Sequence, residues 1–83
     1  MKINTELRSQ IFQIIQHQIK SNNPPETKAT YDRLIAVGYS EFETKQLVGQ
    51  CVAVELFTII KEQQPFNEAR YIRNLKQLPK EPF

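Results

Sequence analysis

The chain has 83 residues, of which 40% are hydrophobic and 24% are charged, and its formal net charge is +2. This composition is that of a folded protein and argues against intrinsic disorder. A chain of this length forms one core and leaves little room for a deep catalytic cleft beside it. We therefore predict a single domain over residues 1–83 that works as a small scaffold or binding module.

The residue types favour helices over a sheet. Only two glycines are present, so the chain offers few of the tight turns that hairpins need. Gln, Glu, Lys, Leu and Ile are abundant, and most of these residues favour helices. We expect an all-α fold, a compact four-helix domain with a long central helix packed by three shorter helices.

The first two helices are expected at about 5–21 and 25–37. Apolar residues recur on one face of the first, and Pro24 and Pro25 end it because proline cannot continue the hydrogen-bond ladder. Pro25 suits the first position of the second helix, and Gly38 suits the left-handed position after its end. The side chains expected in the core from the second helix are Tyr31, Leu34 and Ile35.

The central helix is expected at about 41–63. Ser40 and Glu43 have the spacing of a capping box at its start. Between Leu47 and Ile60, ten of fourteen residues are apolar, more than a one-sided surface helix carries. The broad apolar face comprises Val48, Val52, Leu56, Ile59 and Ile60, and a narrower face comprises Leu47, Cys51 and Val54. A helix with two apolar faces is expected to be the buried axis of the domain.

The last helix is expected at about 68–78, followed by a short tail over 79–83. Asn67 is its predicted N-cap, and Phe66 and Tyr71 have the spacing of a hydrophobic staple across the cap. The predicted inner side chains of this helix are Tyr71, Ile72, Leu75 and Leu78.

Phe57 stands out because it interrupts a polar column of the central helix, next to Ala53. A large aromatic side chain in that place needs cover from the rest of the chain or from another subunit. Ala53 and Phe57 are therefore the candidate interface. We predict a non-catalytic protein–protein interaction or self-association module, with a protein partner or a second copy of the chain as its partner, for example in a homodimer.

No residue pattern indicates an enzyme, and we predict no catalytic residue, cofactor or metal. His17 has no Cys or carboxylate at ligand spacing, and Cys51 lies on an apolar face where a thiol is inert. Glu55 is expected to reach water or to pair with Arg33 or Arg73. A functional Glu55 would require a polar pocket shared with Tyr31 or Tyr71.

The alternative function is weak nucleic-acid binding. Arg70, Arg73 and Lys76 follow one another along the outer face of the last helix, with Lys80 beyond them. Such a basic stripe contacts phosphates in nucleic-acid-binding proteins. On a nearly neutral domain the same stripe is commonly a solvated face, so nucleic acid is the lesser expectation.

The expected location is the cytoplasm. Cys51 is the only cysteine, so no internal disulfide is available and no oxidising compartment is implied. Residues 1–8 lack the apolar stretch of a secretory signal, and no run of residues is apolar and long enough for a membrane span.

Several short motifs resemble those of a group of small, uncharacterised bacterial helical proteins. They are Asn-Pro-Pro-Glu at 23–26, Gly-Tyr-Ser-x-x-Glu at 38–43, Pro-Phe followed by Tyr at 65–71, and Leu-x-x-Leu-Pro at 75–79. The resemblance covers about two thirds of the chain. It implies a helical fold and a bacterial origin, and it implies no catalytic residue because the group has no assigned activity.

Overall fold

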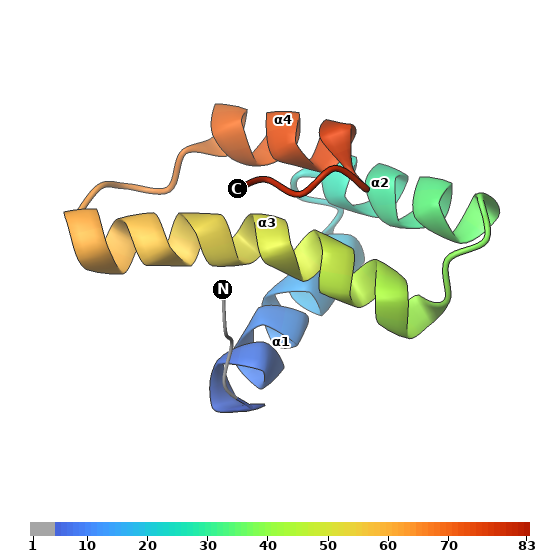
Figure 1. Cartoon of the computed structure of the whole chain (residues 1–83), viewed down its shortest axis with the longest axis horizontal. Coiled ribbons are helices and arrows are strands. Elements are labelled where there is room, and N and C mark those ends of the chain that lie inside the picture. The colour runs from blue at the N-terminus through green and yellow to red at the C-terminus, as the bar shows by residue number, and fades with distance from the viewer. Residues whose placement is uncertain (1–4) are drawn as a thin grey trace.

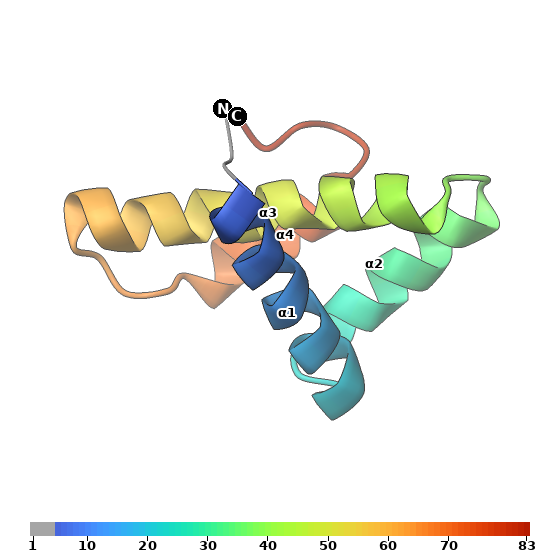
Figure 2. The same ribbon diagram turned by 90° about the horizontal axis from the view of Figure 1, so that it is seen from below.

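The computed structural model describes residues 5–83 and contains four helices in this range. They are α1 (Thr5–Ser21), α2 (Pro25–Ala36), α3 (Glu41–Glu62) and α4 (Glu68–Gln77). Figure 1 shows α3 running across the molecule, with α1 crossing on one side and α4 on the other. Figure 2, seen from below, shows α1 in front of α3 and α4 behind it. The predicted all-α fold with a long central helix is confirmed, and the helix limits differ from those expected by one residue at most.

The corner between α2 and α3 is closed by backbone hydrogen bonds. Val37 is the C-cap of α2, and Gly38 follows in a left-handed conformation with φ of 113°. The Gly38 N–H donates to the carbonyl of Ile35 at 3.0 Å, and the Tyr39 N–H donates to that of Leu34 at 3.1 Å. These two bonds make a Schellman motif, so the predicted role of Gly38 is confirmed.

The start of α3 is the predicted capping box. The Glu43 N–H donates to Ser40 Oγ at 3.1 Å, and the Ser40 N–H donates to Glu43 Oε1 at 3.0 Å. Two N–H groups that the first turn of a helix leaves without partners are thereby satisfied. These hydrogen bonds lower the pKa of the Glu43 carboxyl below its ordinary value. The chain therefore passes from α2 to α3 with almost no loop.

The start of α4 also agrees with the sequence. Asn67 is the N-cap, and its side chain accepts a hydrogen bond from the Arg70 N–H at 3.0 Å. The rings of Phe66 and Tyr71 contact each other with centroids 5.4 Å apart and an interplanar angle of 58°. This contact is the predicted hydrophobic staple, and it fixes the direction in which the linker from α3 enters α4.

The core lies along α3 and receives side chains from all four helices. The fully buried apolar residues are Ile11 and Ile15 of α1, Leu34 of α2, Val48, Cys51, Val52 and Ala53 of α3, Tyr71 and Leu75 of α4, and Leu78 just after it. Gly49 permits the close crossing of α1 and α3, because a Cβ on it would lie only 3.2 Å from Ile11 Cγ2. The expected role of α3 as the axis of the domain is confirmed.

Three apolar residues that the sequence placed in the core are exposed instead. Ile35 of α2 is 37% exposed, and Ile59 and Ile60 of α3 are 37% and 73% exposed. Their positions in the 3.6-residue period match those of buried neighbours, so periodicity assigned them correctly to a face. The neighbouring elements do not cover that face along its whole length, and periodicity carries no information about where the cover ends.

Candidate functional site

An uncovered apolar surface lies on the C-terminal half of α3. Phe57, Ile59 and Ile60 are 38%, 37% and 73% exposed, and Leu56 between them is half-buried. Residues three and four apart on a helix are neighbours, so these four side chains form one continuous patch, which we call the α3 strip. Figures 1 and 2 both show this end of α3 extending past α1, with only the linker to α4 running beside it.

The predicted interface pair Ala53 and Phe57 is divided by the structure. Phe57 is exposed as expected, whereas Ala53 has no exposed surface within the chain. Ala53 points to the same side of α3 as Ile60, but it lies two turns earlier, where the helix is still covered. The assignment of Ala53 to the interface was therefore wrong. Ile60, which the sequence placed in the core, is the most exposed member of the strip.

The α3 strip carries no charge. Within residues 53–60, Glu55 is the one charged residue, and it is 1% exposed. The hydroxyl of Thr58 is also used internally, since it donates to the carbonyl of Val54 at 2.9 Å. Lys61 and Glu62, of opposite sign, follow the strip at its end. An exposed helix surface without charged groups is unusual for a solvated face and typical of the central part of an interface.

Glu55 holds the linker and the start of α4 against α3. Its Oε2 accepts a hydrogen bond from Arg70 Nε at 2.6 Å, and its Oε1 accepts from Arg70 Nη2 at 3.0 Å and from the Asn67 N–H at 2.9 Å. This bidentate geometry is the strong form of an Arg–carboxylate pair. The expected ion pair of Glu55 is confirmed, but its partner is Arg70 and not Arg33 or Arg73, and the option of a solvated carboxylate was wrong.

The same bonds decide the protonation state of Glu55. Burial favours the neutral acid, but the hydrogen bonds from Arg70 and from the Asn67 N–H, together with the positive charge of Arg70, outweigh burial and lower the pKa of this carboxyl below 4.5. Glu55 is therefore ionised at neutral pH. Since its oxygens face Arg70 and a backbone N–H, the carboxylate has a structural role at this position.

Arg33 has a structural partner at the other end of α4. Its Nη1 donates to the carbonyl of Leu78 at 3.0 Å, and its Nη2 donates to the carbonyl of Leu75 at 3.1 Å. The last carbonyls of a helix lack intrahelical partners, and a cation there is also favoured by the helix dipole. Arg33 thus joins α2 to the C-terminal end of α4.

The basic face of α4 is smaller than the sequence indicated. Arg73 and Lys76 are exposed, whereas the guanidinium of Arg70 is paired with Glu55. An arginine with two hydrogen bonds to a buried carboxylate has fewer donors left for a phosphate. The assignment of Arg70 to a solvated stripe was wrong, and two of the three proposed nucleic-acid contacts remain on this helix.

A buried polar cluster joins three helices where α1 meets α2. Gln18 Oε1 of α1 accepts hydrogen bonds from Thr27 Oγ1 of α2 at 2.8 Å and from the Tyr71 hydroxyl of α4 at 2.7 Å. Burial raises the pKa of Tyr71 to about 12, so its hydroxyl stays protonated and donates. The sequence indicated none of this, because polar residues scattered over three helices show no spacing along the chain.

Glu55 and Tyr71, which a catalytic pocket was expected to combine, are engaged with other groups. Glu55 is bonded to Arg70 and Asn67, whereas Tyr71 is bonded to Gln18 and contacts Thr27. The hydroxyl of Tyr71 and the carboxylate of Glu55 thus face different partners.

The remaining reactive side chains lie where the sequence placed them. Cys51 is a free thiol with no exposed surface, and burial raises its pKa to about 12, so the thiol is protonated and inert. His17 is exposed on α1.

Over residues 5–83, no group of three His, Cys, Asp or Glu residues could hold a metal ion. In the same range, no helix is both long and apolar enough to cross a bilayer.

Comparison of the chain with models of protein families, with curated proteins and with solved structures finds no match in any of the three. The resemblance to small bacterial helical proteins stays a prediction. What the chain binds therefore has to be inferred from its own surface, on which the α3 strip is one of the exposed apolar regions.

Proposed function

We propose that this protein is a non-catalytic self-association module, in which two copies pair through the α3 strip. The observation that carries the proposal is the exposure of Phe57, Ile59 and Ile60 on the part of α3 that extends beyond its neighbours. A second copy would remove these side chains from water, at about 25 cal/mol for each square ångström of apolar surface buried.

The absence of charge on the strip favours a second copy over a different partner. In a two-fold dimer the same surface patch meets itself, so a charged patch would place like charges against each other. The strip avoids this repulsion because its one charged residue, Glu55, is buried and paired. Homodimer interfaces are also more apolar than interfaces between partners that exchange. An antiparallel pairing of α3 with α3 of the second copy meets both conditions.

The expected dimer is reversible and depends on concentration. A stable interface of standard size buries about 800 Å² on each partner. The chain exposes 5545 Å² in total, and the strip consists of four side chains, so neighbouring groups of the linker, such as Phe66 at 44% exposure, would complete the contact. The setting that accompanies the proposal is a bacterial cytoplasm, as the sequence motifs and the single cysteine indicate.

Sedimentation equilibrium of the native chain and two surface variants tests the proposal. We expect a monomer–dimer equilibrium for the native chain and a monomer for Ile60→Lys, because a lysine at the most exposed position of the strip brings a positive charge from each copy into the apolar contact. Phe57→Glu is expected to act in the same way through two negative charges.

Val37→Lys is the matched control. Val37 is 67% exposed, close to the 73% of Ile60, but it lies at the α2–α3 corner, away from the strip. This variant is expected to dimerise like the native chain, and far-UV circular dichroism checks that all variants keep their helices. A native chain that stays monomeric at millimolar concentration contradicts the proposal. Dissociation by Val37→Lys with no effect of Ile60→Lys also contradicts it.

A further inference from the structure

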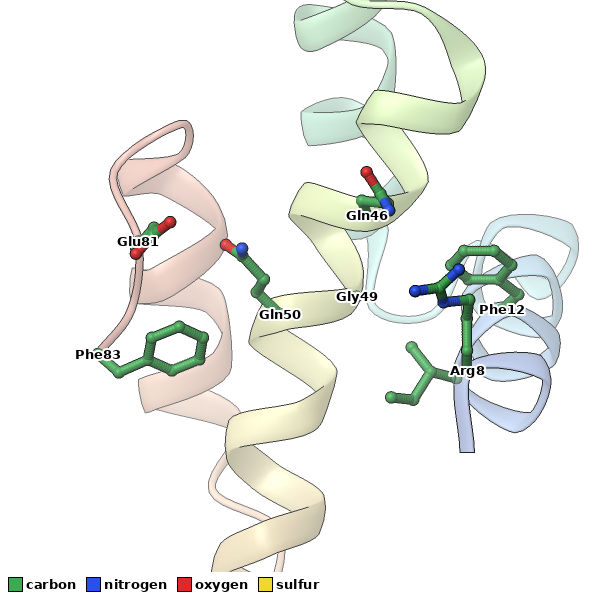
Figure 3. Close-up of a pocket in the computed structure, with 8 residues that line it drawn as sticks. Arg8, Phe12, Gln46, Gly49, Gln50, Glu81 and Phe83 are labelled. Carbon is green, nitrogen blue, oxygen red and sulfur yellow. The ribbon is translucent and has the colours of Figure 1, made fainter. Parts of the chain in front are cut away.

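A second site with different chemistry lies on the N-terminal half of α3, before the strip. A groove of about 330 Å³ runs over α3, with α1 as one wall and residues 79–83 as the other. Figure 3 shows Gln46, Gly49 and Gln50 of α3 between these walls, with Arg8 and Phe12 on the α1 side and Glu81 and Phe83 on the other side. Its volume lies at the lower end of the range of small-molecule sites, roughly 300–1,000 Å³.

The groove contains charged and polar groups that the fold does not use. Within residues 5–83, neither Arg8 nor Glu81 forms an ion pair, and the side chain of Gln46 forms no hydrogen bond. Two unpaired charges of opposite sign on facing walls are therefore available to a ligand in this groove.

Gln50 adds an unsatisfied acceptor. Its Oε1 atom is buried, and among the described residues it has no hydrogen-bond donor. In Figure 3 the amide of Gln50 points from α3 toward Glu81 and Phe83, so the segment over residues 79–83 covers it. Buried carbonyl oxygens without a donor are rare in folded proteins, so Gln50 Oε1 is an acceptor that a donor entering the groove could use.

Few backbone hydrogen bonds among residues 5–83 hold the covering segment to the helices. Beyond α4, one backbone hydrogen bond holds it, from the Lys80 N–H to the carbonyl of Gln77 at 2.9 Å. Glu81 and Phe83 are both exposed, although they line the groove. A ligand donor can therefore reach Gln50 Oε1 after a small displacement of this segment, while the core between the helices stays in place.

From this geometry we propose that the groove binds a small zwitterionic ligand of the dipeptide type with an apolar side chain. Its carboxylate binds Arg8, its ammonium group binds Glu81, and its peptide N–H donates to Gln50 Oε1. The apolar side chain contacts Phe12 and Phe83. A simple anion would leave Glu81 unpaired, and a simple cation would leave Arg8 unpaired, so only a ligand with both charges uses both walls.

Two-dimensional NMR of the ¹⁵N-labelled chain, titrated with the dipeptide leucyl-leucine, tests this proposal. We expect saturable shifts of the backbone amides of Gly49 and Gln50 and of the side-chain amide of Gln50. N-acetyl-leucyl-leucine lacks the ammonium group and leucyl-leucine amide lacks the carboxylate, so both are expected to bind more weakly, by roughly three- to tenfold.

Charge-removing variants identify which wall binds which end of the ligand. Arg8→Gln is expected to weaken the binding of leucyl-leucine by roughly three- to tenfold and to leave the binding of leucyl-leucine amide unaffected. Glu81→Gln is expected to weaken the binding of leucyl-leucine by the same factor and to leave the binding of N-acetyl-leucyl-leucine unaffected. Arg73→Gln removes an exposed arginine outside the groove and is the matched control.

Chemical shifts that do not saturate up to about 10 mM peptide would overturn the proposal. A dissociation constant of roughly 10 mM is the weakest that still indicates a site. Equal weakening by Arg8→Gln and Arg73→Gln would overturn it as well, because only the net charge would then matter. The strip is not part of the groove, so Ile60→Lys should bind the peptide like the native chain. Dimerisation and peptide binding can therefore fail independently.

Discussion

The two halves of the apolar stretch of α3, residues 47–53 and 54–60, contain five apolar residues each and have different surroundings. In the first half, Val48, Cys51 and Val52 are at most 4% exposed, because α1, α2 and α4 enclose the helix. In the second half, Phe57, Ile59 and Ile60 are 37% to 73% exposed, because the helix continues past α1. The comparison shows that apolar density along a helix predicts the need for cover and does not show which chain supplies it. In the first half the cover is intramolecular, and we propose that in the second half it comes from another copy.

The largest expected difference between the halves is in the response to truncation. Val48→Ala removes buried methyl groups and leaves a cavity, so it should lower the free energy of unfolding by about 1–3 kcal/mol. Ile60→Ala removes a larger group from an exposed position. It should change the free energy of unfolding of the monomer by less than about 0.5 kcal/mol. Urea denaturation at low protein concentration measures both values. Equal losses for the two variants would show that the second half of α3 is covered within a single chain.

The junction between the halves should respond to acid through Glu55. The pKa of Glu55 is lowered in the folded chain, so its contribution to stability is complete above the ordinary value of 4.5 and is lost as the pH falls through the lower folded value. We expect the free energy of unfolding to fall below about pH 4.5. Glu55→Gln should be less stable than the native chain at pH 7 by about 1–2 kcal/mol, and the two should converge in acid.

Thermal denaturation of the native chain and Glu55→Gln between pH 2 and pH 7 makes this comparison. Glu43 also has a lowered pKa, so Glu43→Gln is the control for acid effects away from the junction. A constant difference between native and Glu55→Gln at all pH values would show that the Glu55 charge has no net stabilising role.

The smallest expected effect concerns the covered end of the molecule. Thr27→Val keeps the shape of a buried side chain and removes its hydrogen bond to Gln18 Oε1, while the Tyr71 hydroxyl still donates to that oxygen. We expect a loss of about 0.5–1.5 kcal/mol in the free energy of unfolding and no change in association. A Thr27→Val chain that loses its dimer would link this cluster to the strip, contrary to the separation of the two regions.

The sequence predicted well those features that depend on residues close together in the chain. The capping box of Ser40 and Glu43, the left-handed Gly38 and the staple of Phe66 and Tyr71 are each set by spacings of five residues or fewer, and all three are confirmed. The partner of Glu55 could not be predicted in this way. Arg70 reaches Glu55 only because the linker folds back along α3, and helical periodicity contains no information about that path.

The candidate site was predicted in part, for the same physical reason. Phe57 was identified because it breaks a polar column, a property of α3 alone. Ala53 was wrongly included and Ile60 was wrongly excluded, because their exposure depends on where α1 ends relative to α3. The groove residues Arg8 and Glu81 lie 73 positions apart in the sequence, so no local pattern could have joined them.

The most direct test of self-association through α3 is an isotope-filtered nuclear Overhauser experiment on an equal mixture of ¹³C-labelled and unlabelled chains. This experiment detects only contacts between different copies. The account predicts intermolecular cross-peaks between the methyl groups of Ile59 and Ile60 and the ring of Phe57. Intermolecular cross-peaks confined to Val37 at the α2–α3 corner, or none at millimolar concentration, would contradict it.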